Sequence, residues 1–485
     1  MRSLLALIML GACSLSSAQT LSPDVRKFVK IDAPVVALTH VRVIDGTGAA
    51  ARENQTIILN QGKIESVSDA SSASVPKDAQ VLDLQGHSVI PGLVGMHDHM
   101  FYPAGEAIFH EMAISFPRLY LAGGVTTIRT TGSIEPYMDL ALKAKIEHGE
   151  VAGPHIHVTG PYLEGPGSWA PQMTELKTPE EAVATVNFWA DRGVDNFKAY
   201  NFISRAVLKA AIDAAHKRGL KVTGHLCSIG FREAAALGID DLEHGIAVDT
   251  EFFSAKKPDQ CPISSRASMV AVNDELNKMK VTDAPIQDMI HDLVSHHVAV
   301  TSTLPVFELF VPGKTPLQPR VLDAMSPEAR NQFLASRVRA DLPMQDSKTG
   351  ETRATPWGQS FEQEKQFERA FVQAGGLLLA GEDPTGMGGD LAGFGDQREV
   401  ELLVEAGFTP LEAIRIATFN GAQYLGELDR IGTIAAGKQA DLVVIKGDPS
   451  KKIEDIENVE TVFKNGIGYD PAKLIESVRG LVGIR

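Results

Sequence analysis

The chain has few cysteines and, beyond its first residues, no apolar stretch long enough to cross a membrane. Three cysteines occur among 485 residues, and only Cys227 and Cys261 lie outside the N-terminal segment. Two cysteines can form at most one disulfide, which excludes a fold held mainly by disulfides. A transmembrane helix needs about 20 consecutive apolar residues, so we expect no membrane span.

Basic residues are also scarce. Lys and Arg total 46 against 61 Asp and Glu, which gives a net charge of −15. An acidic surface argues against nucleic acid and anionic membranes as main partners, and leaves a small molecule as the expected partner. Hydrophobic residues make up 44% of the chain, enough to bury one large core and a smaller one.

The N-terminus reads "MRSLLALIMLGACSLSSAQT". A charged Arg2, an apolar run and a small-residue site ending at Ala18 follow the order of a secretory signal peptide. We therefore predict a signal peptide over residues 1–18 and a secreted or periplasmic protein. "LGAC" also resembles a lipoprotein box, so a lipid anchor at Cys13 stays open as the alternative.

Short strand-like segments occur at both ends of the mature chain. "VVALTHVRVIDGTG" and "ENQTIILNQGKIESVSDA" lie near the N-terminus, and "GTIAAGKQADLVVIKGD" lies near the C-terminus. Alternating apolar residues bounded by Gly, Asn and Asp are typical of strands and turns. We predict that residues 19–90 and 425–485 together form one small β-sandwich domain.

The middle, residues 91–424, alternates apolar runs with helical stretches. Two helices should begin at capping boxes, Thr178 with Glu181 and Thr409 with Glu412. Eight strand–helix units predict an α/β fold, a (β/α)8 TIM barrel; a doubly wound sheet is less favoured because no G-x-G-x-x-G follows the first strand. Insertions at about 250–280 and 310–360 follow the sixth and seventh strands, so we expect them over the barrel mouth. The eight runs are "SVIPGLVGMHDH", "GVTTIRTTG", "HIHVTGPYL", "VDNFKAY", "LKVTGHLC", "IDDLEHG", "VAVTSTLP" and "GLLLAGEDP".

Polar residues stand at the carboxyl ends of five of these strands. In "PGLVGMHDHM", His97 and His99 share one strand face, where two imidazoles can hold a metal ion. Each residue alone also fits an ordinary role, such as a strand end, a loop cap or a turn. Together the six favour a catalytic centre, because barrel enzymes place their chemistry at strand ends. The six are His97, His99, Lys198, His225, His244 and Asp383.

These segments carry a family resemblance. "VIPGLVGMHDHM", "GGVTTIRTTG", "NFKAY", "VTGHLC", "DDLEHG", "LLAGEDP" and "GTIAAGKQADLVVIKGDP" resemble the metal-dependent amidohydrolase superfamily, and within it the imidazolonepropionase-like branch with prolidases. The resemblance covers nearly the whole mature chain. It implies a hydrolase that cleaves C–N amide bonds of small substrates, such as dipeptides or N-acyl amino acids.

The resemblance also implies a site with two divalent metal ions. His97, His99 and Asp383 would hold the first ion, and His225 and His244 the second. Lys198 would carry a CO2-derived carbamate that bridges the two ions; a bare ammonium cannot ligate a cation. Asp383 would accept the proton of a metal-activated hydroxide and pass it to the leaving nitrogen. Zn2+ suits these ligands, as would Mn2+ or Co2+.

The predicted substrate contacts depart from the family pattern. Arg129 is followed by Thr-Thr-Gly where many relatives have Arg-Asp, and "TGPYLEGPGSW" replaces a Gly-His-rich loop. We predict Tyr200, Tyr162 and Arg129 as substrate-binding residues, with Trp169 as a further candidate, and a homo-oligomer. Three alternatives stay open: a lactone or phosphotriester hydrolase with the same metal site, a mononuclear deaminase, and a non-catalytic binding protein.

Overall fold

The computed structural model of the chain describes residues 21–105, 108–345 and 350–483. The predicted signal peptide, residues 1–18, and the predicted anchor at Cys13 lie outside the described residues. None of the described helices is both long and apolar enough to pass through a lipid bilayer.

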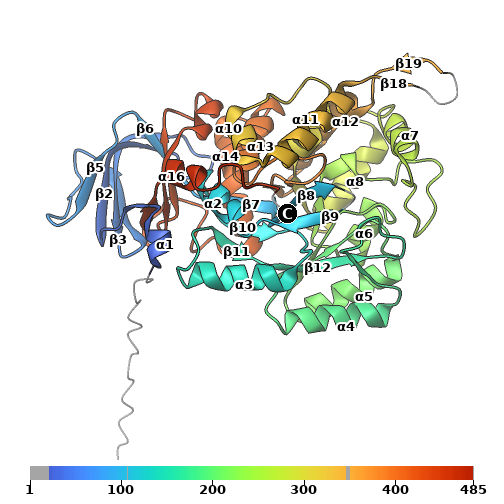
Figure 1. Ribbon diagram of the computed structural model, residues 1–485, viewed down its shortest axis with the longest axis horizontal. Helices are drawn as coiled ribbons and strands as arrows, with labels where there is room; N and C mark the ends of the chain where they lie inside the picture. Colours follow the sequence, from blue (N-terminus) through green and yellow to red (C-terminus); the bar gives the residue numbers. More distant parts are fainter. Residues whose placement is uncertain (1–20, 106–107, 346–349, 484–485) are drawn as a thin grey trace, which may run out of the picture.

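The larger part of the molecule combines parallel strands with helices (Figure 1). The strands run in two arcs, β11-β10-β7 and β13-β12-β14-β15-β16-β17-β20, where β13 is Thr174–Glu175. A bridge between Ser133, just after β10, and Pro161 of β12 links the two arcs on one side. On the other side, the amide of Asp383 donates to the carbonyl of His97 at 3.0 Å. The strands are β7 (Leu93–Asp98), β10 (Val125–Thr130), β11 (His155–His157), β12 (Thr159–Glu164), β14 (Asn196–Ala199), β15 (Lys221–Gly224), β16 (Asp241–Glu243), β17 (Ala299–Ser302) and β20 (Leu378–Ala380).

These arcs give a TIM-barrel-like α/β fold. Each of the eight predicted apolar runs contains one of the strands, and the third run is split into β11 and β12. Helices alternate with the strands, as expected. Both predicted capping boxes are present, at Thr178 with Glu181 and at Thr409 with Glu412. The helices are α2 (Ser115–Ala122), α3 (Pro136–Glu147), α4 (Pro179–Ala190), α5 (Arg205–His216), α6 (Phe231–Leu237), α8 (Ala284–Ser295), α12 (Trp357–Gln373), α13 (Phe394–Glu405), α14 (Pro410–Arg415), η2 (Ile416–Asn420) and α15 (Gly421–Leu425).

Segments from both chain ends form one nine-stranded sheet, at the left of Figure 1. Its order is β1-β23-β22-β21-β6-β2-β3-β4, and β5 pairs with β2. The antiparallel pair β21–β6 joins the C-terminal segment to the N-terminal one. The strands are β1 (Val29–Ile31), β2 (Val35–Val43), β3 (Arg52–Asn60), β4 (Lys63–Asp69), β5 (Gln80–Asp83), β6 (His87–Pro91), β21 (Leu442–Lys446), β22 (Val459–Lys464) and β23 (Ile467–Tyr469). Short helices flank it, α1 (Pro23–Arg26), η3 (Ile453–Glu457) and α16 (Pro471–Glu476).

Longer connections leave the carboxyl ends of three barrel strands. The hairpin of β8 (Phe101–Gly105) and β9 (Ile108–Glu111) follows β7. The segment after β16 contains η1 (Gly245–Ala247) and α7 (Arg266–Leu276). A disulfide between Cys227 and Cys261 ties this segment to the loop after β15, so the one disulfide that the sequence allowed is present. The largely helical insertion after β17 contains α9 (Leu304–Glu308), α10 (Pro319–Ala324), α11 (Pro327–Asp341), β18 (Met344–Gln345) and β19 (Thr352–Arg353).

Candidate metal centre

The six residues predicted at the strand ends all line one cavity of about 650 Å³. His97 lies on β7 and Lys198 on β14. His99, His225 and His244 directly follow their strands, and Asp383 comes three residues after β20. Five of the side chains are buried, and His225 is partly exposed. The fold therefore brings together residues that lie up to 286 positions apart, counted from His97 to Asp383.

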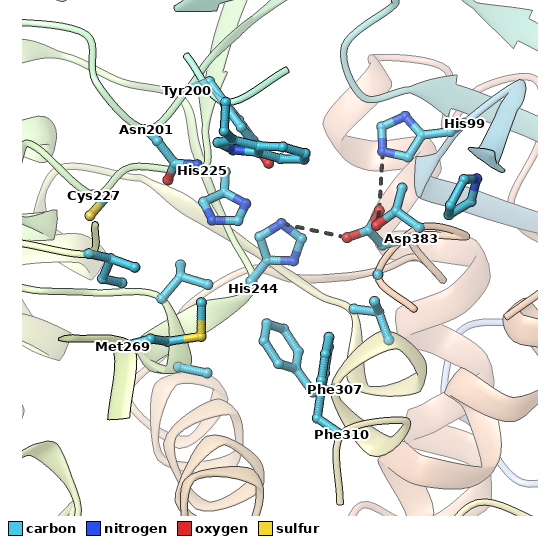
Figure 2. Close-up of a pocket in the computed structure, with 18 of the residues that line it drawn as sticks. His99, Tyr200, Asn201, His225, Cys227, His244, Met269, Phe307, Phe310 and Asp383 are labelled. Atoms are coloured by element: carbon cyan, nitrogen blue, oxygen red, sulfur yellow. Dashed lines mark hydrogen bonds and ion pairs between the residues drawn. The ribbon is translucent and has the colours of Figure 1, made fainter. Parts of the chain in front are cut away.

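The Asp383 carboxylate lies among three imidazoles (Figure 2). Its Oδ1 is 3.2 Å from His99 Nε2 and 3.7 Å from His97 Nε2, and its Oδ2 is 3.9 Å from His244 Nε2. The ring of His225 lies 4.5 Å from that of His244. One ligand atom each from His97, His244 and Asp383 fall within 4.8 Å of one another, so these three residues could hold a metal ion.

The donor set fits a divalent transition metal. Imidazole nitrogens and a carboxylate are ordinary ligands for such ions. Burial lowers the pKa of His225 to about 3, and lowers that of His97 and His244 well below the usual value. These rings are therefore neutral at pH 7, which is the form that binds a metal. The Nδ1 atoms of His97 and His99 are buried without a hydrogen-bond partner.

Two of the strand-end residues have a strained backbone. His244 has φ 69° and Asp383 has φ 57°, in the left-handed region that non-glycine residues rarely adopt. Strain of this kind costs on the order of 1–3 kcal/mol and tends to collect at functional sites. Both side chains line the same cavity, His244 directly after β16 and Asp383 three residues after β20.

Lys198 has a buried partner that the sequence analysis did not identify. Its Nζ forms an ion pair with Glu243, and the same carboxylate lies 3.6 Å from His97 Nδ1. Thr223 donates a hydrogen bond of 2.6 Å to Glu243 Oε1. Burial lowers the pKa of Lys198 well below the usual lysine value. Glu243 directly precedes His244 in "LEHG". An acid beside a predicted metal ligand was the one sign in the sequence that Glu243 belongs to the site.

Arg129 does not contact the cavity, which corrects the prediction that it binds substrate. Its side chain is fully buried on the inner side of β10. The guanidinium donates from Nη2 to Asp241 Oδ2 at 2.8 Å and from Nε to the carbonyl of Met96 at 2.8 Å. It therefore braces β7 against β16. Tyr162, Tyr200 and Trp169 do line the cavity.

A second acidic group lies next to the same strands. Asp98 points away from His97 and His99, as strand alternation predicts, and its ligand atoms approach those of Glu382 and Asp396 within 4.8 Å. All three are buried. Burial raises the pKa of Asp98 and Glu382 well above the usual values and that of Asp396 to about 7. A measured metal content must therefore be assigned to one of two candidate groups, the histidine-rich group at the cavity or this group of three carboxyl side chains.

Comparison with known proteins places this geometry in context. The model of the amidohydrolase family matches residues 88–257 and 372–467, more than half of the chain. A dihydroorotase from Pelotomaculum thermopropionicum is 24% identical over 425 residues, which cover 85% of this chain and 89% of that one. The first curated relatives, also of the dihydroorotase kind, are matched over only 19% of their length.

Solved structures share the whole fold. A prolidase-like protein from Bifidobacterium longum is 24% identical with a TM-score of 0.65, over 92% of this chain and 99% of that chain. A Xaa-Pro dipeptidase is 20% identical with a TM-score of 0.64, over 90% and 100% of the two chains. Because the family model matches more than half of the sequence, the chain belongs to the amidohydrolase family.

Proposed function

We propose that this protein hydrolyses a C–N amide bond of a small substrate at a centre of two divalent metal ions. The observation that carries the proposal is the convergence of six strand-end side chains on one cavity, with the Asp383 carboxylate among the imidazoles. The dihydroorotase, prolidase-like and dipeptidase names of the relatives are in keeping with an amide substrate.

In this proposal the six residues divide between the two ions. His97, His99 and Asp383 would hold the first, His225 and His244 would hold the second, and Lys198, once carbamylated, would serve as a ligand as well. When bound, the ions, most suitably Zn2+, supply Lewis acidity and lower the pKa of a water molecule. Glu243 suits this role of Lys198, since a carbamate retains one N–H, which could donate a hydrogen bond to the carboxylate that now forms an ion pair with Lys198.

Asp383 performs the proton transfer. Burial alone would raise its pKa, but the hydrogen bond with His99 and the nearby His244 hold the pKa below the usual value. The carboxylate is therefore ionised and able to accept a proton from the attacking water. As the C–O bond forms and the C–N bond breaks, Asp383 returns that proton to the departing nitrogen, and an acid and an amine are released.

A lactone or phosphotriester hydrolase is the second candidate. The apolar lining of the cavity favours it, because phosphotriesters need a broad apolar pocket. Such substrates break a C–O or P–O bond, and their leaving group needs less protonation than an amine. Turnover of lactones or phosphotriesters without any amide hydrolysis would establish this candidate instead.

Three further features belong to the proposal. The N-terminal pattern, together with the Cys227–Cys261 disulfide, supports export, since disulfides persist in oxidising compartments.

The apolar core around Ile57, Val444 and Phe463 draws on strands that are distant within the nine-stranded sheet, which supports a sheet folded into a sandwich. We also propose a homo-oligomer. Cell fractionation, the N-terminal mass and light scattering test export, processing and assembly.

Metal analysis tests the core of the proposal. The purified protein should contain two divalent ions per chain, and removal of the ions by a chelator should abolish amide hydrolysis. Lys198→Ala should lose at least one ion. Asp396→Asn is the matched control, because it alters the other acidic group and should leave the count at two. A fully active enzyme with one ion would contradict the binuclear centre.

A further inference from the structure

Aromatic rings form a line that leads outward from the metal centre. The ring of His99 stacks on Phe101 with centroids 4.3 Å apart. Phe101 lies 5.1 Å from Phe109, and Phe109 lies 6.1 Å from Trp169. All of these residues line the cavity, and Trp169 is 48% exposed. Aromatic rings attract one another in stacked and edge-to-face arrangements. This wall is therefore suited to binding an aromatic group of the substrate.

A second apolar wall comes from a different part of the chain. Phe307 on α9 has its ring 5.6 Å from that of His244, and Phe310 lies beside it (Figure 2). Met269 of α7 approaches the same space. These side chains come from the two insertions, whereas Phe101 and Phe109 come from the β8–β9 hairpin. A substrate at the centre therefore contacts apolar groups from separate segments.

Apart from the proposed metal centre, the described residues that line the cavity offer no free cation to a carboxylate. Apart from the imidazoles, Lys198 is the one basic side chain among the described residues that line it, and Lys198 is paired with Glu243. Lys256 lies behind the lining residue Cys227 but donates to the carbonyl oxygens of Cys227 and Gln260. Away from the metal centre, a carboxylate that enters this space loses its water without gaining a charge-assisted hydrogen bond from the described side chains.

The remaining polar groups of the lining are neutral. Asn201, Asn273, Gln332, Ser360 and Thr385 supply amides and hydroxyls, and Asp383 is the one acid among the described lining residues. Neutral donors and acceptors orient an uncharged ligand and leave its charge state as it is. A volume of about 650 Å³ lies within the usual range for sites that enclose a ligand of drug-like size.

We propose that the substrate is an uncharged amide with an aromatic group beside the scissile bond, and not a dipeptide with a free carboxylate at that place. The proposal rests on the proposed amide hydrolysis and names the substrate class of that site. It departs from the dipeptides and N-acyl amino acids expected from the sequence. Water adds to the carbonyl carbon, the C–N bond breaks, and the nitrogen takes a proton from the water, so that an acid and an amine are released, at least one of them aromatic.

A matched pair of substrates tests this inference. N-benzoylphenethylamine and N-benzoylphenylalanine differ only in the carboxylate next to the amide nitrogen. The metal-loaded enzyme should hydrolyse the first with a kcat/KM about tenfold or more above the second, and above that of glycylproline. An equal or higher kcat/KM for either carboxylated substrate would overturn the proposal.

Binding of ketomethylene isosteres of the same pair separates this inference from the proposed function. These compounds have no C–N bond to cleave, so calorimetry reports recognition alone. Tighter binding of the uncharged isostere supports the substrate class even if no amide is hydrolysed, in which case only the proposed reaction fails. Tighter binding of the charged isostere contradicts the substrate class whatever the reaction.

A substitution in the second wall gives an independent measurement. Phe310→Arg places a guanidinium in the cavity and should shift the ratio of the two kcat/KM values toward the carboxylated substrate by about tenfold. Phe310→Leu is the control and should keep the wild-type preference. An unchanged ratio in a folded, metal-loaded Phe310→Arg protein would show that charge at this wall does not select the substrate.

Discussion

The Nδ1 atom of His244 and the Oγ1 atom of Thr303 lie 2.7 Å apart in the buried layer below the cavity. Thr303 directly follows β17, which pairs with β16, and His244 directly follows β16. If Nε2 of His244 holds a metal, Nδ1 carries the proton and donates a hydrogen bond to the hydroxyl of Thr303. The hydroxyl then fixes both the tautomer and the orientation of the ring.

Thr303→Val should therefore weaken metal binding without removing a ligand. We expect a loss of roughly 10–100-fold in affinity for the ion held by His244, the usual effect of removing such a supporting hydrogen bond. Competition with a chromogenic chelator measures it. Thr303→Ser retains the hydroxyl and should bind the metal nearly as the wild type does, whereas equal losses in both variants would indicate a packing effect.

Lys198→Ala should abolish most of the activity, because it removes the proposed bridge between the ions. Short carboxylic acids such as formate should restore part of the rate by occupying the place of the carbamate. After equilibration with 13C-bicarbonate, the wild type should give a carbamate signal by 13C NMR that Lys198→Ala lacks. Absence of the signal from active wild type would indicate that Lys198 remains an ammonium paired with Glu243.

Asp383→Asn distinguishes a ligand from a proton shuttle. Asparagine keeps the shape and one carbonyl oxygen but cannot accept a proton. We expect the variant to retain much of its metal while kcat falls by roughly 10²–10⁴-fold, the usual contribution of a general acid–base group. Metal analysis and steady-state kinetics on the same preparation check this. A near wild-type kcat with both ions bound would leave Asp383 as a ligand at most.

Glu164→Gln should change how stability depends on pH. Burial of Glu164, at the end of β12, raises its pKa to about 7, even though its carboxylate accepts hydrogen bonds from the amides of Gly165 and Phe202. The folded protein therefore binds more protons than the unfolded chain between about pH 4.5 and 7. This makes the free energy of unfolding fall as the pH rises through that window, by up to about 3 kcal/mol.

Glutamine stays neutral across this range and can keep both amide hydrogen bonds. Chemical unfolding of the two proteins at pH 5 and pH 8 should show that Glu164→Gln loses less stability than the wild type. Parallel losses would mean that the Glu164 carboxylate is not responsible for the pH dependence.

The residues at the strand ends could be predicted from the sequence, because in these segments an apolar run contains or is followed by a histidine, lysine or aspartate. His97, His99 and Lys198 follow this pattern, and the structure brings them to one cavity. Arg129 also lies on a strand, but alternation gives only the face of a side chain and not its depth. Its partner Asp241 is 112 positions away, so the sequence could not reveal that the guanidinium is already paired.

The walls of the cavity could not be predicted in the same way. The insertions contain Phe307, Phe310 and Met269. These segments are not barrel strands, so the alternation of side chains along a strand does not predict where these residues point. Their positions depend on how the insertions pack, which is a matter of long-range contacts. The terminal strands were predicted from their composition, but composition does not determine that β2 pairs with three other strands at once, β3, β5 and β6.

The bond between Cys227 and Cys261 makes maturation of the enzyme a chemical step as well as a folding step. Cys227 lies two residues beyond His225, and both cysteines line the cavity. A chain kept under reducing conditions would still contain every metal-binding side chain, but one wall of its cavity would lack the covalent tie. The redox history of a preparation should therefore influence which substrates it accepts, even at full metal content.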